Sequence, residues 1–382
     1  MAQQLQLWHS PAPALAFMYA PVVSTVSAAL SGTPLTLVHR AARPHTARGA
    51  RGDWFVFIGP ELVDKVPWAR LRAQGVHTVW YSTEPFDGCS SVASDEVWSY
   101  TWRTVERCRG SLQMYRYVPP GALRVAGAEV AAAAGGDTPV VLFGFPHFKS
   151  GRGACYAFLE RSLGARRLSA TFSVWNNSAL LLWWEEVGRR ATHLTLHKHC
   201  RLDGHSSTQP LESFRLSILL SLGATVISEH SYPRDEQEYA GLVTFGTLQE
   251  IPRLLNEPKA PRSAVDIARR FRRRFSPTAI LERAGVYDSL RRTRAAAQPP
   301  PEPLLPAHGA AAQGSVRPLR AEPRDAPPRR DAPPAASRYA LLVHGRMGSL
   351  HAGPSMSLAQ HSEAHPQASP PPLSRVRSSL AA

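Results

Sequence analysis

A strand–helix–strand pattern near the middle of the chain constrains the fold more than any other feature. Residues 192–197 alternate apolar and polar side chains, as a strand does, and a polar loop follows them. Pro210 opens an expected helix with Glu212 in its first turn and Gly223 just past its end, the positions that proline and glycine favour. Residues 224–229 are a further apolar run with a polar end. This spacing predicts a parallel α/β unit, whose ligands bind where its strands end.

The same alternation of strand and helix runs through both halves of the chain. Short loops between the elements favour parallel sheets with helices on both faces. We therefore expect an α/β fold with two Rossmann-like domains that face a cleft, at residues 1–121 and 139–257, joined by an Ala/Gly-rich linker at 122–138. The runs expected to form strands are residues 5–8, 34–39, 53–59, 77–85, 96–100, 114–118, 139–144, 168–175, 192–197 and 224–229, and residues 239–245 lead to another strand.

Composition changes sharply towards the end of the chain. All nine Trp lie between Trp8 and Trp184, whereas 16 of the 34 Pro lie after residue 298. Residues 258–382 hold 20 Lys and Arg against 8 Asp and Glu, which is +12 of the total net charge of +15. We expect a basic helical segment at 258–297 and a disordered tail at 298–382, because the tail has too little apolar surface to order itself. The nearly neutral remainder argues against a specific nucleic-acid partner.

Cysteine usage and the uncharged start of the chain bear on localisation. The chain has four cysteines, which are Cys89, Cys108, Cys155 and Cys200. They lie far apart without a Cys-x-x-Cys pair, which indicates reduced, intracellular thiols and predicts neither disulfides nor a zinc site. Residues 2–38 lack charged side chains, but Pro21 interrupts the run and a buried strand and helix explain it better than a signal peptide or anchor. We expect a cytoplasmic protein. The alternative is a peripheral protein on an internal membrane, with residues 263–294 contacting anionic lipid or acidic partners.

The central stretch also resembles a known family. It is similar to the donor half of GT-B-fold glycosyltransferases, and more narrowly to the CgeB-like and "glycosyl transferases group 1" branch. The similarity extends over residues 50–257 and is strongest at 192–245. It implies a nucleotide-sugar donor in the second domain, an unidentified glycan, protein or small-molecule acceptor, and no bound metal or other cofactor. The residues that carry it are His197, Glu212, Arg215, 219–223, 226–229, Tyr239 and 243–245.

The loop after residues 139–144 is a candidate phosphate site. Gly144 lets the backbone approach a ligand, and Lys149 or Arg152 could meet a phosphate. Related transferases often carry a basic residue where this chain has Phe145. The alternative is a plain turn from strand to helix.

Glu212 and Arg215 are the strongest candidates for contacts to the nucleotide. A carboxylate in the first turn of a helix can accept both hydroxyls of a ribose, the contact that the resemblance implies for Glu212. Arg215, three residues on, could reach a phosphate or pair with Glu212. A surface ion pair between the two is the structural alternative, and it would matter little.

Four further residues complete the expected site. His197 is expected near the donor and in catalysis, whereas His193 is expected in the core and the histidines fit no zinc spacing. Glu84 ends a strand of the first domain and could act as a general base on the acceptor, or cap the turn that follows. Ser228 and Glu229 end the strand after Gly223 and are expected to line the donor sugar, with helix capping as the alternative.

Absent motifs narrow the function further. The chain has no Asp-x-Asp pair, Walker loop, complete Gly-x-Gly-x-x-Gly or Gly-x-Ser-x-Gly elbow. The absences remove support for metal-dependent GT-A transferases, nucleoside-triphosphate enzymes, dehydrogenases and hydrolases, and the resemblance to GT-B transferases then implies a metal-independent glycosyltransferase of the hexosyltransferase type. The alternative is a non-catalytic GT-B-like binding or scaffold protein whose basic tail engages acidic partners. Phe145 and Thr195, which replace a basic residue and an Asn of the family, favour the alternative, whereas Glu212 and Arg215 favour the enzyme.

Overall fold

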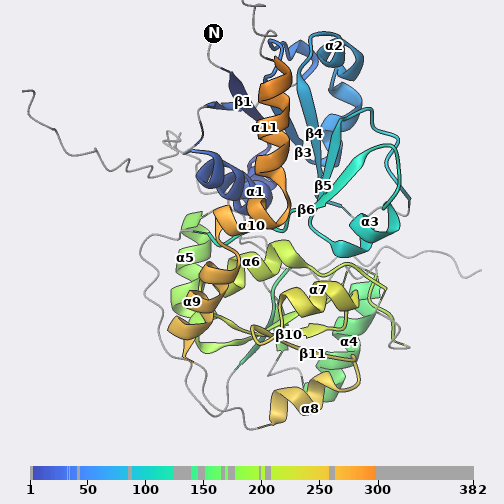
Figure 1. The fold of residues 1–382 in the computed structure, drawn as a ribbon. Coiled ribbons are helices and arrows are strands. Elements are labelled where there is room, and N and C mark those ends of the chain that lie inside the picture. Colours follow the sequence, from blue (N-terminus) through green and yellow to red (C-terminus); the bar gives the residue numbers. More distant parts are fainter. Residues whose placement is uncertain are drawn as a thin grey trace, which may run out of the picture. The chain divides into compact units, whose positions relative to one another are not determined.

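The computed structural model describes most of the chain up to residue 297. Its described residues build two parallel sheets with helices, so the expected α/β fold with two Rossmann-like halves is confirmed (Figure 1). The expected tail and almost all of the expected linker lie outside these residues. The described ranges are 3–31, 33, 35–40, 44–84, 88–123, 139–144, 151–164, 168–170, 177–197, 199–202, 208–257 and 263–297.

The first sheet has the strand order β2-β1-β3-β4-β5-β6, and all of its strands are parallel. Every residue of β3 is buried, as expected for a continuous apolar run covered on both faces. The strands are β1 (Gln4–His9), β2 (Thr36–Arg40), β3 (Trp54–Ile58), β4 (His77–Ser82), β5 (Glu96–Ser99) and β6 (Met114–Tyr117). The helices are α1 (Pro13–Leu30), α2 (Trp68–Ala73), α3 (Trp102–Arg107) and the 3-10 turns η1 (Pro44–Thr46) and η2 (Pro60–Lys65).

The second sheet is also parallel, with the order β11-β10-β9-β7-β8. The chain leaves β7 for β8 on one side and returns to β9 on the other, so the order reverses between β7 and β9, the place where such sheets bind ligands. Its strands are β7 (Val140–Leu142), β8 (Leu168–Ala170), β9 (Thr192–Thr195), β10 (Thr225–Glu229) and β11 (Val243–Gly246). Its helical elements are α4 (Gly151–Leu163), α5 (Asn177–Glu186), η3 (Gly188–Arg190), α6 (Ser213–Ser221), α7 (Pro233–Glu238) and α8 (Ile251–Asn256).

Helix α6 begins later than the sequence predicts. The expected start at Pro210 is wrong, because Glu212 has a ψ of 54°, outside the helical region, and is the residue that precedes the helix. Its end is confirmed: Gly223 follows the last turn with a φ of +80°, a conformation that glycine adopts without strain.

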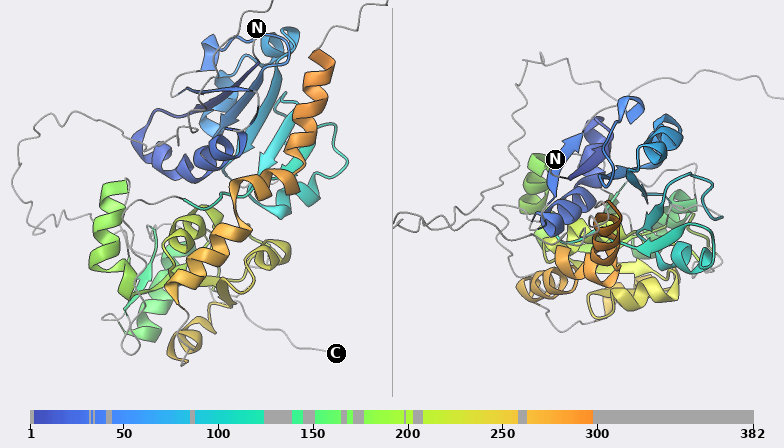
Figure 2. Two further views of the ribbon diagram at one scale, coloured as in Figure 1. Left: turned by 60° about the vertical axis from the view of Figure 1, so that its left-hand side comes forward. Right: turned by 45° about the horizontal axis from the view of Figure 1, so that its top comes forward.

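Three helices follow the second sheet: α9 (Ala264–Arg274), α10 (Pro277–Arg283) and α11 (Val286–Ala297). The expected basic segment is helical, and its apolar side chains also join the main core: Ile267, Phe271, Phe275, Ile280, Leu281 and Val286. Figures 1 and 2 show α11 alongside the first sheet, where the Tyr287 hydroxyl donates to the carbonyl of Ala29 at the end of α1. Among the described helices, none combines the length and the apolar character that a membrane crossing requires.

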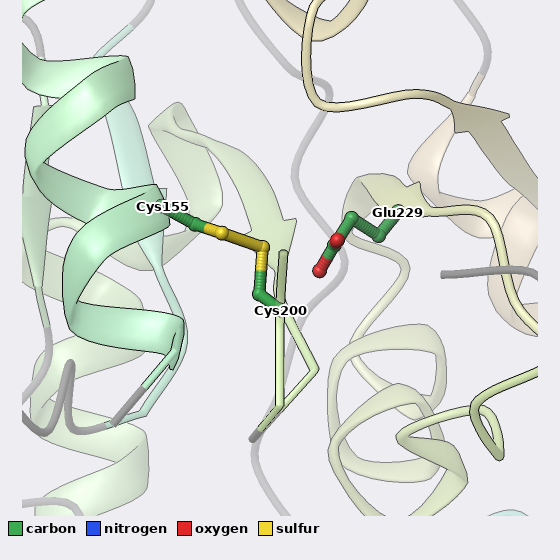
Figure 3. Close-up of side chains that lie close together, drawn as sticks. All are labelled: Cys155, Cys200 and Glu229. Carbon is green, nitrogen blue, oxygen red and sulfur yellow. A yellow bond between two sulfur atoms is a disulfide. The ribbon is translucent and has the colours of Figure 1, made fainter. Parts of the chain in front are cut away.

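The expectation of unpaired cysteines is wrong. Cys89 pairs with Cys108 across 19 residues. Cys155 pairs with Cys200 across 45 residues, as Figure 3 shows. The fold brings each pair together, with Cα atoms 5.4 and 6.2 Å apart. Linear spacing could not reveal this, because neither pair lies within one element.

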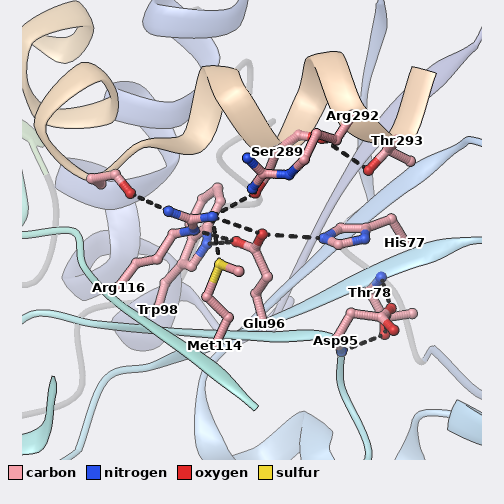
Figure 4. Close-up of polar contacts among 11 residues, drawn as sticks. His77, Thr78, Asp95, Glu96, Trp98, Met114, Arg116, Ser289, Arg292 and Thr293 are labelled. Carbon is pink, nitrogen blue, oxygen red and sulfur yellow. Dashed lines mark hydrogen bonds and ion pairs between the residues drawn. The ribbon is translucent and has the colours of Figure 1, made fainter. Parts of the chain in front are cut away.

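A buried polar network attaches α11 to the first sheet (Figure 4). Glu96, at the start of β5, accepts hydrogen bonds from Arg116 Nε at 2.7 Å and from the Trp98 indole at 2.9 Å. Arg116 also donates to the Ala284 carbonyl and to the Ser289 hydroxyl of α11. Burial alone would raise the pKa of Glu96, but hydrogen bonds from His77 and Arg116 outweigh burial and lower that pKa to about 2. The carboxylate is therefore charged at neutral pH and holds its partners in place.

Candidate functional site

The carboxyl ends of β7, β9 and β10 gather most of the predicted site residues. Because parallel strands end at one edge of the sheet, residues far apart in sequence come together there. Lys149 lies outside the described residues, and Glu84 belongs to the first sheet. The predicted residues found at this edge are Gly144, His197, Glu212, Arg215, Ser228 and Glu229.

An ion triad forms the centre of this edge. The Glu212 carboxylate forms ion pairs with both arginines. Its Oε1 lies 2.6 Å from Arg152 Nη2, and its Oε2 lies 2.8 Å from Arg215 Nη1. The side chain of Arg152 is 4% exposed, against 16% for Arg215 and 23% for Glu212. Arg152 Nε also donates to the Leu196 carbonyl at 2.9 Å. The Glu212–Arg215 pair is thus one arm of a partly buried triad that the sequence did not reveal.

The charges in the triad support one another. Burial alone would raise the pKa of Glu212, but the guanidinium groups of Arg215 and Arg152 outweigh burial and hold that pKa below its usual value. Burial lowers the pKa of Arg152, while Glu212 acts to raise it. Glu212 is therefore an anion across the neutral range, and it faces two cations.

Gly144 follows β7 and lies against Arg215. Its φ of +125° is a conformation that side chains with a Cβ rarely adopt. A Cβ placed on it would come within 2.9 Å of Arg215 Nε. The glycine therefore leaves the space that the guanidinium occupies at the end of the strand.

His197 is fixed by main-chain and side-chain hydrogen bonds. Its Nε2 lies 2.9 Å from the His230 carbonyl, and because a carbonyl only accepts, Nε2 carries the hydrogen. Its backbone N–H donates to Glu229 Oε2 at 2.9 Å. Burial lowers the pKa of His197, although Glu212 acts in the opposite direction. The ring is therefore neutral at pH 7, and its Nε2–H donates a hydrogen bond to the His230 carbonyl.

His193 lies in the core, as expected. Its Nε2 lies 2.8 Å from the Gly188 carbonyl, and its ring stacks on Trp184 at 5.9 Å between centroids. Burial lowers its pKa to about 4. A neutral, enclosed imidazole of this kind supports packing.

Glu84 lies near the same region from the first sheet. Its side chain is exposed, and its carbonyl accepts from the Ser82 hydroxyl at 2.8 Å. Tyr100 packs edge-on against Phe214 of α6 at 5.4 Å. Burial raises the pKa of Tyr100, and the charges of Glu212 and Glu84 raise it further. Both carboxylates therefore lie close enough to Tyr100 for their charges to raise its pKa.

Asp235 links α7 to α3. The sequence does not predict this contact, because an acidic residue in the first turn of a helix is common without one. Its Oδ2 accepts from the Thr101 hydroxyl at 2.5 Å and its Oδ1 from the backbone N–H of Trp102 at 2.7 Å. Burial raises its pKa to about 7, although these hydrogen bonds act to lower it. Asp235 thus caps α3 and titrates near neutral pH.

Comparison with known proteins gives structural neighbours. No family model matches the chain, and no curated protein matches it. One similar structure is an alpha,alpha-trehalose-phosphate synthase (UDP-forming) from Burkholderia xenovorans in complex with glucose-6-phosphate, at 12% identity and a TM-score of 0.45, covering 75% of this chain and 100% of that one.

Two further neighbours have lower TM-scores. Anabaena Alr3699/HepE in complex with UDP and glucose has 11% identity and a TM-score of 0.42, covering 76% of this chain and 100% of that one. A putative UDP-N-acetylglucosamine 2-epimerase from Listeria monocytogenes has 9% identity and a TM-score of 0.33, covering 80% and 100%. The narrower CgeB-like resemblance stays a prediction. Since these likenesses assign no activity to this chain, its function has to be inferred from the site.

Proposed function

We propose that this protein binds a nucleotide-sugar donor at the carboxyl ends of β7, β9 and β10 and transfers the sugar to an acceptor. The observation that carries the proposal is the Arg152–Glu212–Arg215 triad at the switch point between β7 and β9. The partly exposed guanidinium of Arg215 beside Gly144 suits a diphosphate, and the carboxylate between the two arginines suits sugar hydroxyls.

The two arginines have different roles in this proposal. Arg152 is nearly enclosed and also holds the Leu196 carbonyl, so it positions Glu212. Arg215 is more exposed and lies against Gly144, so it meets the phosphates. The N-termini of α4 and α6 add backbone donors. Lys149, which lies between β7 and α4 in sequence and outside the described residues, is proposed as a further phosphate contact.

Glu212 is proposed to accept the ribose hydroxyls. A carboxylate has about four lone-pair sites, so it can keep both arginines and still accept two hydroxyl hydrogens. Its lowered pKa keeps it an acceptor throughout the neutral range. The ribose contact therefore does not require the triad to break.

Transfer of the sugar places negative charge on the departing diphosphate. Fixed guanidinium groups stabilise such charge without a bound metal, which is why we propose a metal-independent reaction of the hexosyltransferase type. Glu84 is proposed to take the proton of the acceptor hydroxyl, since its carboxylate is exposed beyond β4. His197, Ser228 and Glu229 are proposed to line the donor sugar, His197 through its fixed ring.

Calorimetric titration of the full chain with a panel of nucleoside diphosphates and nucleotide sugars tests the proposal. We expect saturable binding of at least one nucleotide, unchanged by EDTA, and slow release of the nucleoside diphosphate from its sugar conjugate. Binding that disappears with EDTA and returns with magnesium or manganese would overturn metal independence. Tight binding without any release over days would favour the alternative of a non-catalytic binding protein.

A further inference from the structure

Two cysteines and a carboxylate meet in the interior beside the proposed donor site. Cys155 comes from α4, Cys200 from the turn after β9, and Glu229 from the end of β10 (Figure 3). All three are buried, and their sulfur and carboxylate oxygen atoms lie within 4.8 Å of one another. Three elements thus aim potential metal ligands at one point.

The structure holds the two sulfurs as a disulfide. A dithiol reductant would supply two electrons and two protons, breaking the S–S bond and leaving two thiols while the reductant becomes a disulfide. Two thiolates on a tetrahedral zinc ion lie roughly 3.8 Å apart, as Zn–S bonds of about 2.3 Å require. The Cα atoms are 6.2 Å apart, so side-chain rotation alone can provide that separation.

We propose that the reduced protein binds one Zn²⁺ through Cys155, Cys200 and Glu229, with water as the fourth ligand. Thiolates select zinc over harder cations, and on binding the two thiols release their protons. The disulfide and zinc-bound states exclude each other, because a bonded sulfur has no thiolate to offer. The zinc site shares Glu229 with the proposed donor site, but its formation does not require a bound nucleotide.

The surroundings of Glu229 fit a metal ligand. Its Oε2 accepts from the backbone N–H of His197 at 2.9 Å, and outer hydrogen bonds of this kind orient a ligating carboxylate. The positive charge of Arg152 lies close enough to interact with Glu229. Two thiolates and a carboxylate on Zn²⁺ leave a net charge of about −1, which the guanidinium offsets.

The second cysteine pair provides a matched control. Cys89 is exposed and Cys108 buried, and within the described part of the chain the metal-ligand group contains neither of them. A site built by cysteine pairing alone would form at either pair. A site that needs the third ligand forms only at Cys155 and Cys200.

Zinc content and cobalt spectra of the full chain test the proposal. After reduction and removal of metal, added Zn²⁺ should bind at one ion per chain and release two protons, while the oxidised chain binds none. The C89S/C108S double variant should keep the site, and C155S/C200S should lose it. Glu229→Gln should weaken affinity by about tenfold or more, as loss of a ligand or its orienting partners does.

Cobalt(II) keeps the test decisive if a variant fails to fold. In the reduced wild-type chain and in C89S/C108S it should give a thiolate-to-metal charge-transfer band of equal intensity, which disappears on oxidation. A reduced wild-type chain that binds neither ion, or a band that disappears in C89S/C108S, would overturn the proposal.

Discussion

Arg152 and Glu212 form an ion pair across 60 residues of sequence, with Nη2 and Oε1 2.6 Å apart. The pair joins the first turn of α4 to the residue that precedes α6. It holds the carboxylate in one orientation at the end of the second sheet.

Glu212→Ala should lower the free energy of unfolding by about 1–3 kcal/mol, because a nearly enclosed Arg152 loses its carboxylate. Urea unfolding of the purified variant measures the loss. Glu185→Ala removes an exposed pair with Arg189 and should cost less than about 1 kcal/mol. Equal losses in the two variants would mean that the triad is only a surface contact.

Glu96→Gln should destabilise the protein at neutral pH by about 3 kcal/mol, since it removes the charge that Arg116 faces. The folded pKa of Glu96 is lowered to about 2 from 4.5, so its contribution is present above about pH 4.5 and is lost as pH falls towards 2. Thermal melts from pH 2 to 7 should therefore show a shallower acid dependence in the variant. An identical slope in both proteins would contradict this account of the network.

Asp235→Asn should flatten the pH dependence between about pH 4 and 7. The folded pKa of Asp235 is raised to about 7 from 3.8, so the folded state binds the proton more tightly. The stability from this group is present below about pH 3.8 and is lost as pH rises through 7. Urea unfolding across this range should show the falling component only in wild type, and its persistence in the variant would assign it to another group.

A chain that ends after Ala297 should melt at the temperature of the full protein, because α11 ends there. A chain that ends after Glu257 should not fold cooperatively, because it lacks Phe271, Phe275 and Leu281 of the main core. Circular dichroism of both truncations measures the difference. A folded, cooperative 1–257 fragment would show that α9–α11 are dispensable.

The architecture was predictable because local patterns determine it. Apolar runs such as residues 54–58 mark buried parallel strands, and Gly223 marks a helix end. Parallel topology then brings strand ends together, so the order of strands and helices along the chain is enough to predict Gly144, His197 and Glu229 at one edge of a sheet.

Long-range pairings were not predictable from one sequence. The Arg152–Glu212 contact, the Cys155–Cys200 disulfide and the Asp235 cap each join elements far apart in the chain. The burial of one face of α9 was also not predicted. Its four buried residues are interspersed with charged side chains, so the segment reads as basic and exposed. The sequence predicts too early a start for α6, because Pro210 is a residue that favours the first turn of a helix. The structure shows that the backbone of Glu212 is not helical.

The nucleotide affinity of Arg215→Gln tests the central claim most directly. Arg215 is proposed to meet the diphosphate, and a charged hydrogen bond to it is worth roughly 1.5–3 kcal/mol. Calorimetric titration with the tightest-binding nucleoside diphosphate should show affinity at least about tenfold weaker than wild type. Arg253→Gln, which alters an exposed pair with Glu257 on α8, should bind as wild type does. Wild-type affinity in a folded Arg215→Gln protein would contradict the proposed donor site.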